Sequence, residues 1–222
     1  MIAPFHFAGA ALQLDPAGVV VWPAERMLIV ADLHLEKGSA AARRGQLVPP
    51  WDSRLTLERL GLLLHRYAPR TVVALGDSFH DDGGPARLGT EDAATLRRMT
   101  AAAQFIWVRG NHDPAPPAGV GGESVAEWAA GALLFRHQAA AGASGELSGH
   151  FHPKARVATR AGQVVRPCFI TDGRKLMLPS FGAYTGGLDV RAPAIAAHFT
   201  RGARIFLLGE ARLFSFSLVQ AA

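Results

Sequence analysis

The chain has 222 residues, of which 49% are hydrophobic and 18% charged, a composition that excludes a disordered protein and suffices for one domain over residues 1–222. The net charge is +5, no apolar stretch reaches the roughly 18 residues that span a bilayer, and the N-terminus lacks a signal-peptide pattern. A single cysteine excludes an intrachain disulfide, so we expect a cytoplasmic protein with no membrane contact.

Strands and helices alternate in the first half of the chain. Apolar runs and helical leucine spacing predict, in order, strands 19–22 and 27–31, helix 52–67, strand 71–75, helix 91–102 and strand 105–108. Asp52 or Ser53 is the expected N-cap of the first helix. This alternation indicates an α/β layer arrangement.

Predicted strands crowd together after residue 123. They are 133–136, 146–149, 154–159, 163–165, 168–171, 175–178, 194–199, 204–208 and 212–218. Asp172-Gly173 is typical of a hairpin turn, and the Pro/Gly-rich stretches 83–89 and 114–122 are expected to be loops. The simplest architecture is two packed β-sheets with helices on the outside, in the α/β class.

Carboxylate, imidazole and amide side chains follow the predicted strands where each strand ends. These residues are Asp32, His34, Asp77, Asn111, His112, His137, His150 and His152. Ligand sites in α/β sheets lie at this edge, and we expect Asp32 and His34, two positions apart, to share one face of a strand. The mixture of donors suits Mn, Fe, Zn or Ni, and burying such groups is costly without an ion.

The same residues form five motifs in a fixed order. They are Asp32-x-His34, Gly76-Asp77-x-x-His80, Gly110-Asn111-His112-Asp113, His137 and Gly149-His150-x-His152. This series resembles the calcineurin-like metallophosphoesterases, which implies a sandwich of two mixed β-sheets flanked by helices. Many members of that family have an aspartate where this chain has His80, and that aspartate supports the catalytic histidine. The departure leaves Asp113 or His80 itself as the support here.

A closer resemblance is to a bacterial subgroup, the ligase-associated DNA-repair endonucleases, which are encoded with a DNA ligase and a helicase-like protein. The matching segments are 31–38, 43–45, 75–80 and 178–187. This resemblance implies a phosphodiesterase that cuts DNA, single-stranded DNA in particular, during repair. It also implies a functional association with a DNA ligase and a helicase.

The family resemblance implies two divalent transition metals, Mn²⁺ in the first place, with Fe, Zn, Ni or Co as alternatives. The implied ligands are Asp32, His34, Asp77 and His152 for one metal, and Asp77, Asn111, His137 and His150 for the other. Two such ions about 3.5–4 Å apart would activate a bridging hydroxide for in-line attack on phosphorus. His112, which is not needed as a ligand, would stabilise charge on the phosphate or protonate the leaving group.

Substrate contacts are less specific in the sequence. The candidates are His80, Asp113, Lys37, Arg43 and Arg44. For the three basic residues a phosphate contact and a solvated helix face are both open. The positive charge as a whole, which is mostly arginine, indicates either a polyanionic partner or the base composition of the coding genome.

Two other functions compete with a DNA endonuclease. One is a hydrolase of small phosphoesters, such as a nucleotide phosphatase or a cyclic-nucleotide phosphodiesterase, and the other is a non-catalytic metal-binding scaffold. The complete ligand set and His112 argue against the scaffold, while basic charge and the subgroup segments favour DNA over a small substrate. RNA remains open as a substrate. Trp51, Trp107 and Trp128 are candidates for base stacking, but packing in the core or at its rim is the favoured interpretation.

Overall fold

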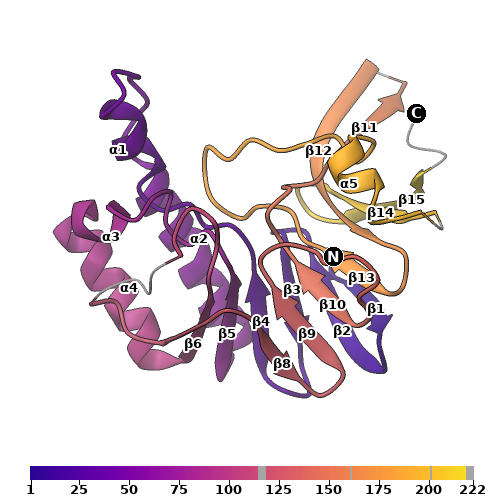
Figure 1. Ribbon diagram of the computed structural model, residues 1–222, viewed down its shortest axis with the longest axis horizontal. Coiled ribbons are helices and arrows are strands. Elements are labelled where there is room, and N and C mark those ends of the chain that lie inside the picture. Colours follow the sequence, from indigo (N-terminus) through magenta and orange to yellow (C-terminus); the bar gives the residue numbers. More distant parts are fainter. Residues whose placement is uncertain (115–118, 161, 201, 219–222) are drawn as a thin grey trace.

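The computed structural model describes residues 1–114, 119–160, 162–200 and 202–218. Two β-sheets pack face to face, with the larger helices covering the outer face of the first sheet (Figure 1). This confirms the predicted α/β arrangement of two mixed sheets flanked by helices.

The first sheet joins the N-terminal strands to the strands of the alternating half. In spatial order it comprises β1 (Ala3–Phe7), β2 (Ala10–Asp15), β3 (Val19–Trp22), β4 (Met27–Val30), β5 (Thr71–Leu75), β6 (Gln104–Val108) and β7 (Glu123–Val125). Strands β1 to β4 pair antiparallel, and β4 to β7 pair parallel. The carboxyl ends of β4, β5 and β6 therefore meet at one edge.

The second sheet holds most of the C-terminal half. In spatial order it comprises β15 (Leu213–Ser217), β14 (Arg204–Leu208), β12 (Gly162–Thr171), β13 (Lys175–Met177), β10 (Glu146–Ser148), β9 (Leu133–Arg136) and β8 (Trp128–Ala130), with β11 (Lys154–Thr159) paired to β12. β9 and β10 are parallel, with Ser148 opposite Arg136, so these two strands also end side by side.

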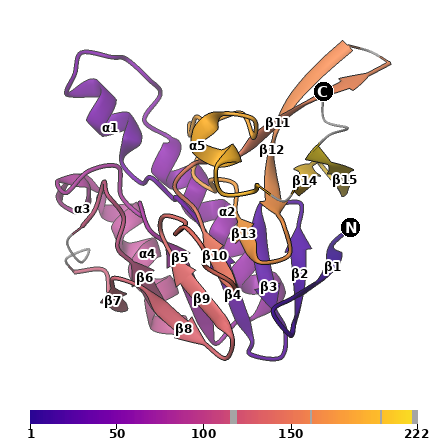
Figure 2. The ribbon, with the colours of Figure 1, turned by 45° about the vertical axis from the view of Figure 1, so that its right-hand side comes forward.

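Alternation along each central strand divides the apolar side chains between two layers. Ile29 and Val73 face the core between the sheets, whereas their neighbours Leu28 and Val72 face the helices. The helices are α1 (Lys37–Ala42), α2 (Asp52–Tyr67), α3 (Gly84–Arg87), α4 (Thr90–Ala102) and α5 (Pro193–Ala196). Helices α2 and α4 lie on the first sheet, and a third apolar cluster packs the short α5 on the outer face of the second sheet (Figure 2).

The structure corrects several predicted elements. Residues 194–199, predicted as a strand, contain the helical turn α5, which begins at Pro193, where a fixed φ favours the first position of a helix. The predicted strands 163–165 and 168–171 are one strand, β12, which pairs with β11 up to Pro167 and with β14 from Cys168. The elements that the sequence did not predict are β1, β2, β7, β8, α1 and α3.

Local capping also differs from the prediction. The N-cap of α2 is Trp51, and no side chain caps the helix there. Asp52 instead accepts a hydrogen bond from the backbone of Gly38, and the Ser53 hydroxyl joins Glu36, so both side chains hold the segment that follows the first motif. Of the loops expected from Pro and Gly content, 83–89 contains α3, and part of 114–122 lies outside the described residues.

The core between the two sheets supports a single domain over residues 1–222, which we propose as the unit of folding. Its buried side chains come from both halves of the chain, among them Leu14 and Ile29 from the first sheet and Phe135 and Phe169 from the second. We expect one cooperative unfolding transition in calorimetry, with equal calorimetric and van't Hoff enthalpies. Two separated transitions would contradict this proposal.

Within the part of the chain that the structure describes, no helix combines the length and the apolar character needed to cross a membrane.

Candidate metal centre

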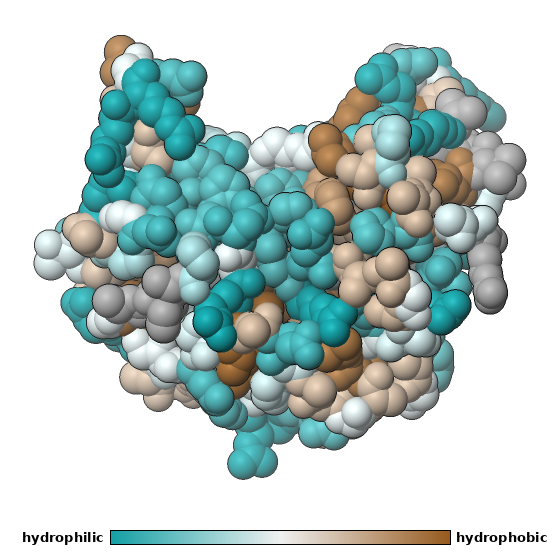
Figure 3. All heavy atoms as spheres, viewed as in Figure 1, coloured by the Kyte–Doolittle hydropathy of each residue, from teal (hydrophilic) through white to brown (hydrophobic). Residues whose placement is uncertain are grey.

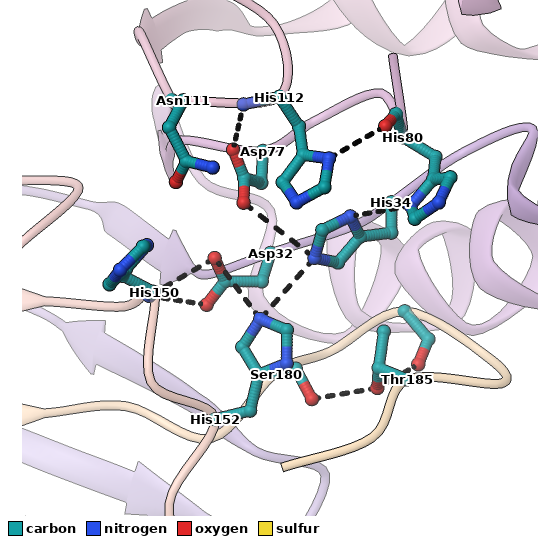
Figure 4. Close-up of polar contacts among 12 residues, drawn as sticks. Asp32, His34, Asp77, His80, Asn111, His112, His150, His152, Ser180 and Thr185 are labelled. Carbon is teal, nitrogen blue, oxygen red and sulfur yellow. Dashed lines mark hydrogen bonds and ion pairs between the residues drawn. The ribbon is translucent and has the colours of Figure 1, made fainter. Parts of the chain in front are cut away.

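The loops that follow β4, β5, β6, β9 and β10 bring the eight motif residues together, and all of them except His137 are labelled in Figure 4. They are Asp32, His34, Asp77, Asn111, His112, His137, His150 and His152. The parallel pairing of β4, β5 and β6 sets three of these loops side by side, and the second sheet supplies the other two. The sequence therefore predicted which residues meet, because strand ends meet at one edge.

One cluster consists of Asp32, His34 and His152, whose potential ligand atoms all lie within 4.8 Å of one another. The Nε2 atoms of His34 and His152 are 3.3 Å apart, and His152 Nε2 is 3.6 Å from Asp32 Oδ1. Asp32 is completely buried. Two imidazole nitrogens and a buried carboxylate directed at one point are the donor set of a divalent transition metal.

A second cluster consists of Asp77, His137 and His150. His137 Nε2 lies 3.0 Å from His150 Nδ1 and 3.4 Å from Asp77 Oδ1. The amide oxygen of Asn111 is 2.9 Å from the same His137 nitrogen, so it can join the cluster as a fourth donor. The described residues thus offer a carboxylate, two imidazoles and an amide here, which suits a second divalent ion.

Asp77 faces both clusters. Its Oδ1 is the oxygen near His137, whereas its Oδ2 lies 3.8 Å from His34 Nε2 in the first cluster. The carboxylate is nearly buried, at 2% exposure for the residue. One oxygen directed to each cluster is the geometry of a bridging carboxylate between two ions.

The backbone of the motifs is in the left-handed region at most of these residues. The φ angles are 53° at Asp32, 43° at His34, 44° at Asp77, 70° at His150 and 49° at His152. Each such non-glycine residue costs about 1–3 kcal/mol and persists where the surroundings fix it, often at functional sites. Asp32 and His34 lie beyond the end of β4 in this conformation. The expectation that they share a strand face was wrong, although both reach the same cluster.

Two glycines leave the space that the carboxylates occupy. A Cβ at Gly110 would overlap Asp77 Oδ1, and a Cβ at Gly149 would overlap Asp32 Oδ2. The backbone N–H of His150 then donates to both oxygens of Asp32, at 3.1 and 3.0 Å. Gly110 and Gly149 therefore allow the main chain to approach the carboxylates of Asp77 and Asp32 and to orient them.

Electrostatics at the histidines fit ligand chemistry. Burial lowers the pKa of His34 to about 2, so its imidazole is neutral at pH 7 and free to bind an ion. Burial also acts to lower the pKa of His137, but the hydrogen bond to Asp77 and the charge of Asp32 together raise it to about 9. His137 Nδ1 donates to the backbone oxygen of Leu75 at 2.9 Å, which turns Nε2 toward the cluster. A metal ion would replace the proton at Nε2.

His112 lies beside the two clusters, and neither includes it. Its backbone N–H donates to Asp77 Oδ1 at 2.9 Å, and its ring Nδ1 donates to the carbonyl oxygen of His80 at 2.8 Å. This second bond fixes the tautomer and leaves Nε2 available to a substrate. The support of His112 thus comes from the main chain of His80.

His80 and Asp113, the two residues expected to support His112, make different contacts. The His80 ring stacks on His112 at 5.0 Å between centroids, and its Nδ1 is 3.4 Å from Nδ1 of His34. Burial together with Lys37, His112 and Arg44 lowers the pKa of His80 to about 4. The Asp113 carboxylate is buried and accepts hydrogen bonds from the backbones of Phe79 and Gly110, so it ties two motif loops together.

Lys37, Arg43 and Arg44 lie on α1 and at its C-terminal end. Lys37 is half-buried, and its pKa is lowered first by burial, with Asp52 opposing this effect and Lys154 adding to it. Arg43 and Arg44 are exposed. Lys154, whose positive charge adds to this lowering of the Lys37 pKa, was not among the sequence candidates.

The loop after β13 lies within segment 178–187, which the sequence matched to the subgroup without indicating a structural role. Phe181 and Gly182 donate their backbone N–H groups to the carbonyls of Ala31 and Asp32, and Ala183 donates to the hydroxyl of Thr56. A Cβ at Gly182 would overlap the carbonyl of Leu33. The loop thus holds the first motif in place through main-chain contacts, which cannot be predicted from a pattern of side chains.

The chain is similar in sequence and in fold to known proteins. The sequence profile of the calcineurin-like phosphoesterases matches residues 25–174. The crystal structure of Pseudomonas putida nuclease MPE superposes with a TM-score of 0.74 at 28% identity, over 96% of this chain and 100% of that one. YfcE, a phosphoesterase from E. coli, gives a TM-score of 0.43 at 13% identity, over 86% and 98% of the two chains. No curated protein matches this chain in sequence.

Proposed function

The chain belongs to the calcineurin-like phosphoesterase family and is a metal-dependent phosphoester hydrolase, and from this premise we propose that it is a two-metal phosphodiesterase that cuts DNA internally during repair. The observation that carries the two-metal proposal is the position of Asp77, with one carboxylate oxygen near each cluster. The nuclease likeness over 96% of the chain supports a nucleic-acid substrate.

We assign the ligands accordingly. Asp32, His34, Asp77 and His152 would hold one ion, and Asp77, Asn111, His137 and His150 would hold the other. The spacing of the donor atoms in the two clusters supports this division. We propose Mn²⁺ as the working metal, with Fe, Zn, Ni and Co as alternatives that the same donors accept.

Two bound cations would supply an activated water and neutralise the phosphate oxygens. The residues of the chain provide the rest of the chemistry. The backbone N–H of His150 and the Gly149 turn hold Asp32, and the Leu75 carbonyl orients His137. His112, held by the His80 carbonyl, places Nε2 where it stabilises charge on the phosphate or gives a proton to the leaving oxygen.

Circular single-stranded DNA provides the test of this function. Purified protein with Mn²⁺ is expected to convert the circle to linear molecules, because only internal cleavage opens a closed strand. A His112→Ala protein prepared in parallel controls for contaminating nuclease. An intact circle, together with hydrolysis of bis(p-nitrophenyl) phosphate, would exclude the endonuclease and favour a small-phosphoester substrate. A circle of single-stranded RNA, tested in the same way, decides between the two nucleic acids.

We further propose that the protein works in the cytoplasm with a DNA ligase and a helicase. The subgroup segments 31–38 and 178–187 support this association, and the second of these anchors the first motif. Co-purification of the tagged chain with its own organism's ligase, after nuclease treatment of the extract, is the expected result. Recovery of neither enzyme under those conditions would contradict a stable association.

A further inference from the structure

Two segments project from the body on opposite sides of a hollow (Figures 1 and 3). The first prong is residues 37–51, which comprise α1 and the stretch that leads to α2. The second prong is residues 154–160 and 162–167, in β11 and the first part of β12 (Figure 2). In the first prong every residue from 42 to 51 is exposed.

Both prongs begin at the first metal cluster. The first prong starts at Lys37, three residues after His34, and the second starts at Lys154, two residues after His152. The Nε2 atoms of these two histidines are 3.3 Å apart. The two prongs therefore leave the same candidate metal site in different directions, and a chain bound at that site would run between them.

The prongs hold the whole excess of positive charge. Residues 37–51 and 154–167 contain seven of the 23 lysines and arginines and none of the 18 acidic residues. The remainder of the chain, with 16 basic and 18 acidic residues, therefore has a net charge of −2. A genome-wide bias toward arginine would spread the charge over the chain, so this segregation favours a polyanionic partner at the prongs.

The prong arginines are also free of acidic partners. Within the described ranges, no carboxylate pairs with Arg43, Arg44, Arg160 or Arg166, and Arg156 bonds only the amide oxygen of Gln163, at 3.1 Å. Elsewhere on the molecule Arg54, Arg87 and Arg136 each pair with an acidic side chain, whereas among the described residues Arg97 and Arg98 on α4 do not. The guanidinium groups of the prongs are thus left for an external anion.

Large apolar side chains lie exposed beside these arginines on the first prong. Leu47 is 96% exposed, Trp51 54% and Val48 39%, whereas Trp22 and Trp107 are 9% and 2% exposed. An exposed aromatic ring next to unpaired arginines suits the bases and backbone of a single strand. A duplex would hide its bases from such a ring.

We propose that the two prongs bind single-stranded nucleic acid on the two sides of the bond cleaved at the metal centre. The first prong stacks bases on Trp51 and contacts phosphates through Arg43 and Arg44, and the second contacts phosphates alone. This inference deepens the proposed function, since it names the surface that holds the substrate. A protein partner seated here would cover the route to the clusters, whereas a substrate strand must follow it.

Salt dependence of binding tests the phosphate contacts. Binding of a fluorescent single-stranded oligonucleotide is measured by anisotropy against salt concentration, with every protein carrying His112→Ala so that the metal centre stays loaded while cleavage is slow. Each lost contact lowers the log–log slope by about 0.7, so an Arg43→Ala/Arg44→Ala protein should lose about 1.4 and an Arg156→Ala/Arg160→Ala/Arg166→Ala protein about 2. The matched control is Arg97→Ala/Arg98→Ala, two exposed arginines on α4. Unchanged slopes in both prong variants, or an equal loss in the control, would overturn the proposal.

Tryptophan fluorescence tests the stacking contact independently. Saturation with the unlabelled oligonucleotide should quench the emission of the wild-type protein, and Trp51→Phe should remove most of that quenching. Trp51→Ala should weaken binding by about 5- to 100-fold. Quenching that persists in Trp51→Phe would show that Trp51 is not the platform.

Failure of this inference is distinguishable from failure of the proposed function. Metal content, measured by mass spectrometry, should be unchanged in every prong variant, because none alters a cluster residue. Hydrolysis of bis(p-nitrophenyl) phosphate by the wild-type protein tests the enzyme separately from the prongs. Normal hydrolysis with unchanged oligonucleotide binding would reject the prongs and keep the enzyme. A wild-type dimer in sedimentation that Trp51→Ala dissociates, without effect on the salt slope, would instead make the first prong a contact between copies of this chain.

Discussion

An Asp77→Asn protein is expected to lose both metal ions and to hydrolyse phosphodiesters at least about 10³-fold more slowly, because bound cations supply several kcal/mol of transition-state stabilisation. Asp77 has one oxygen near His34 and the other near His137, so it is the residue shared between the clusters. An amide of the same shape keeps the volume but removes the negative charge that two adjacent cations require. Metal content by mass spectrometry and rates with bis(p-nitrophenyl) phosphate measure the two effects.

The control for this substitution is Asp82→Ala, because Asp82 is an exposed carboxylate on the same loop after β5. It should retain both ions and full activity. A melting temperature of metal-free Asp77→Asn close to that of the metal-free wild type would show that the loss is not unfolding. Loss of a single ion, with the other retained at full occupancy, would mean that Asp77 belongs to one cluster and does not bridge.

A His112→Ala protein is expected to keep both ions and to lose turnover by about 10²- to 10⁴-fold, the usual range for a general acid or base. The His112 ring is exposed and belongs to neither cluster, and its contacts run to the backbone oxygen of His80 and, through its own N–H, to Asp77. Alanine keeps that N–H, so the bond to Asp77 survives. Equal loss of metal in this variant would refute the assignment.

The leaving group distinguishes the two roles open to His112. A sugar alkoxide needs a proton as it departs, whereas p-nitrophenolate leaves without one. If His112 protonates the leaving oxygen, His112→Ala should reduce DNA cleavage far more than hydrolysis of bis(p-nitrophenyl) phosphate. If His112 only stabilises charge on the phosphate, both substrates should slow by similar factors.

Much of the site was predictable because it depends on side-chain identity at strand ends. Apolar runs located β4, β5, β6, β9 and β10, and the polar residues that follow them include every member of both clusters. The support of His112 was not predictable in the same way. It comes from the carbonyl of His80, a group that every residue has, so no side-chain pattern records it.

The fold was predicted where periodicity was unambiguous and missed where it was not. Helix α2 has buried leucines at 57, 60 and 63 and was predicted. Strand β1 contains Pro4, and both Pro4 and His6 are exposed, so it offers no continuous apolar run and was missed. The apolar run 194–199 fits a strand or a helix equally well, and Pro193 decides for the helix. The left-handed backbone of Asp32 and His34 could not be predicted either, because the sequence around these two residues does not distinguish them from the continuation of a strand.

Diffraction from crystals grown with Mn²⁺, recorded at the manganese absorption edge, tests the two-metal centre most directly. A two-metal centre should give two anomalous peaks about 3.5–4 Å apart. One should lie among Asp32, His34 and His152, the other among Asn111, His137 and His150, with one oxygen of Asp77 directed to each. A single peak, or two peaks that Asp77 does not join, would contradict it.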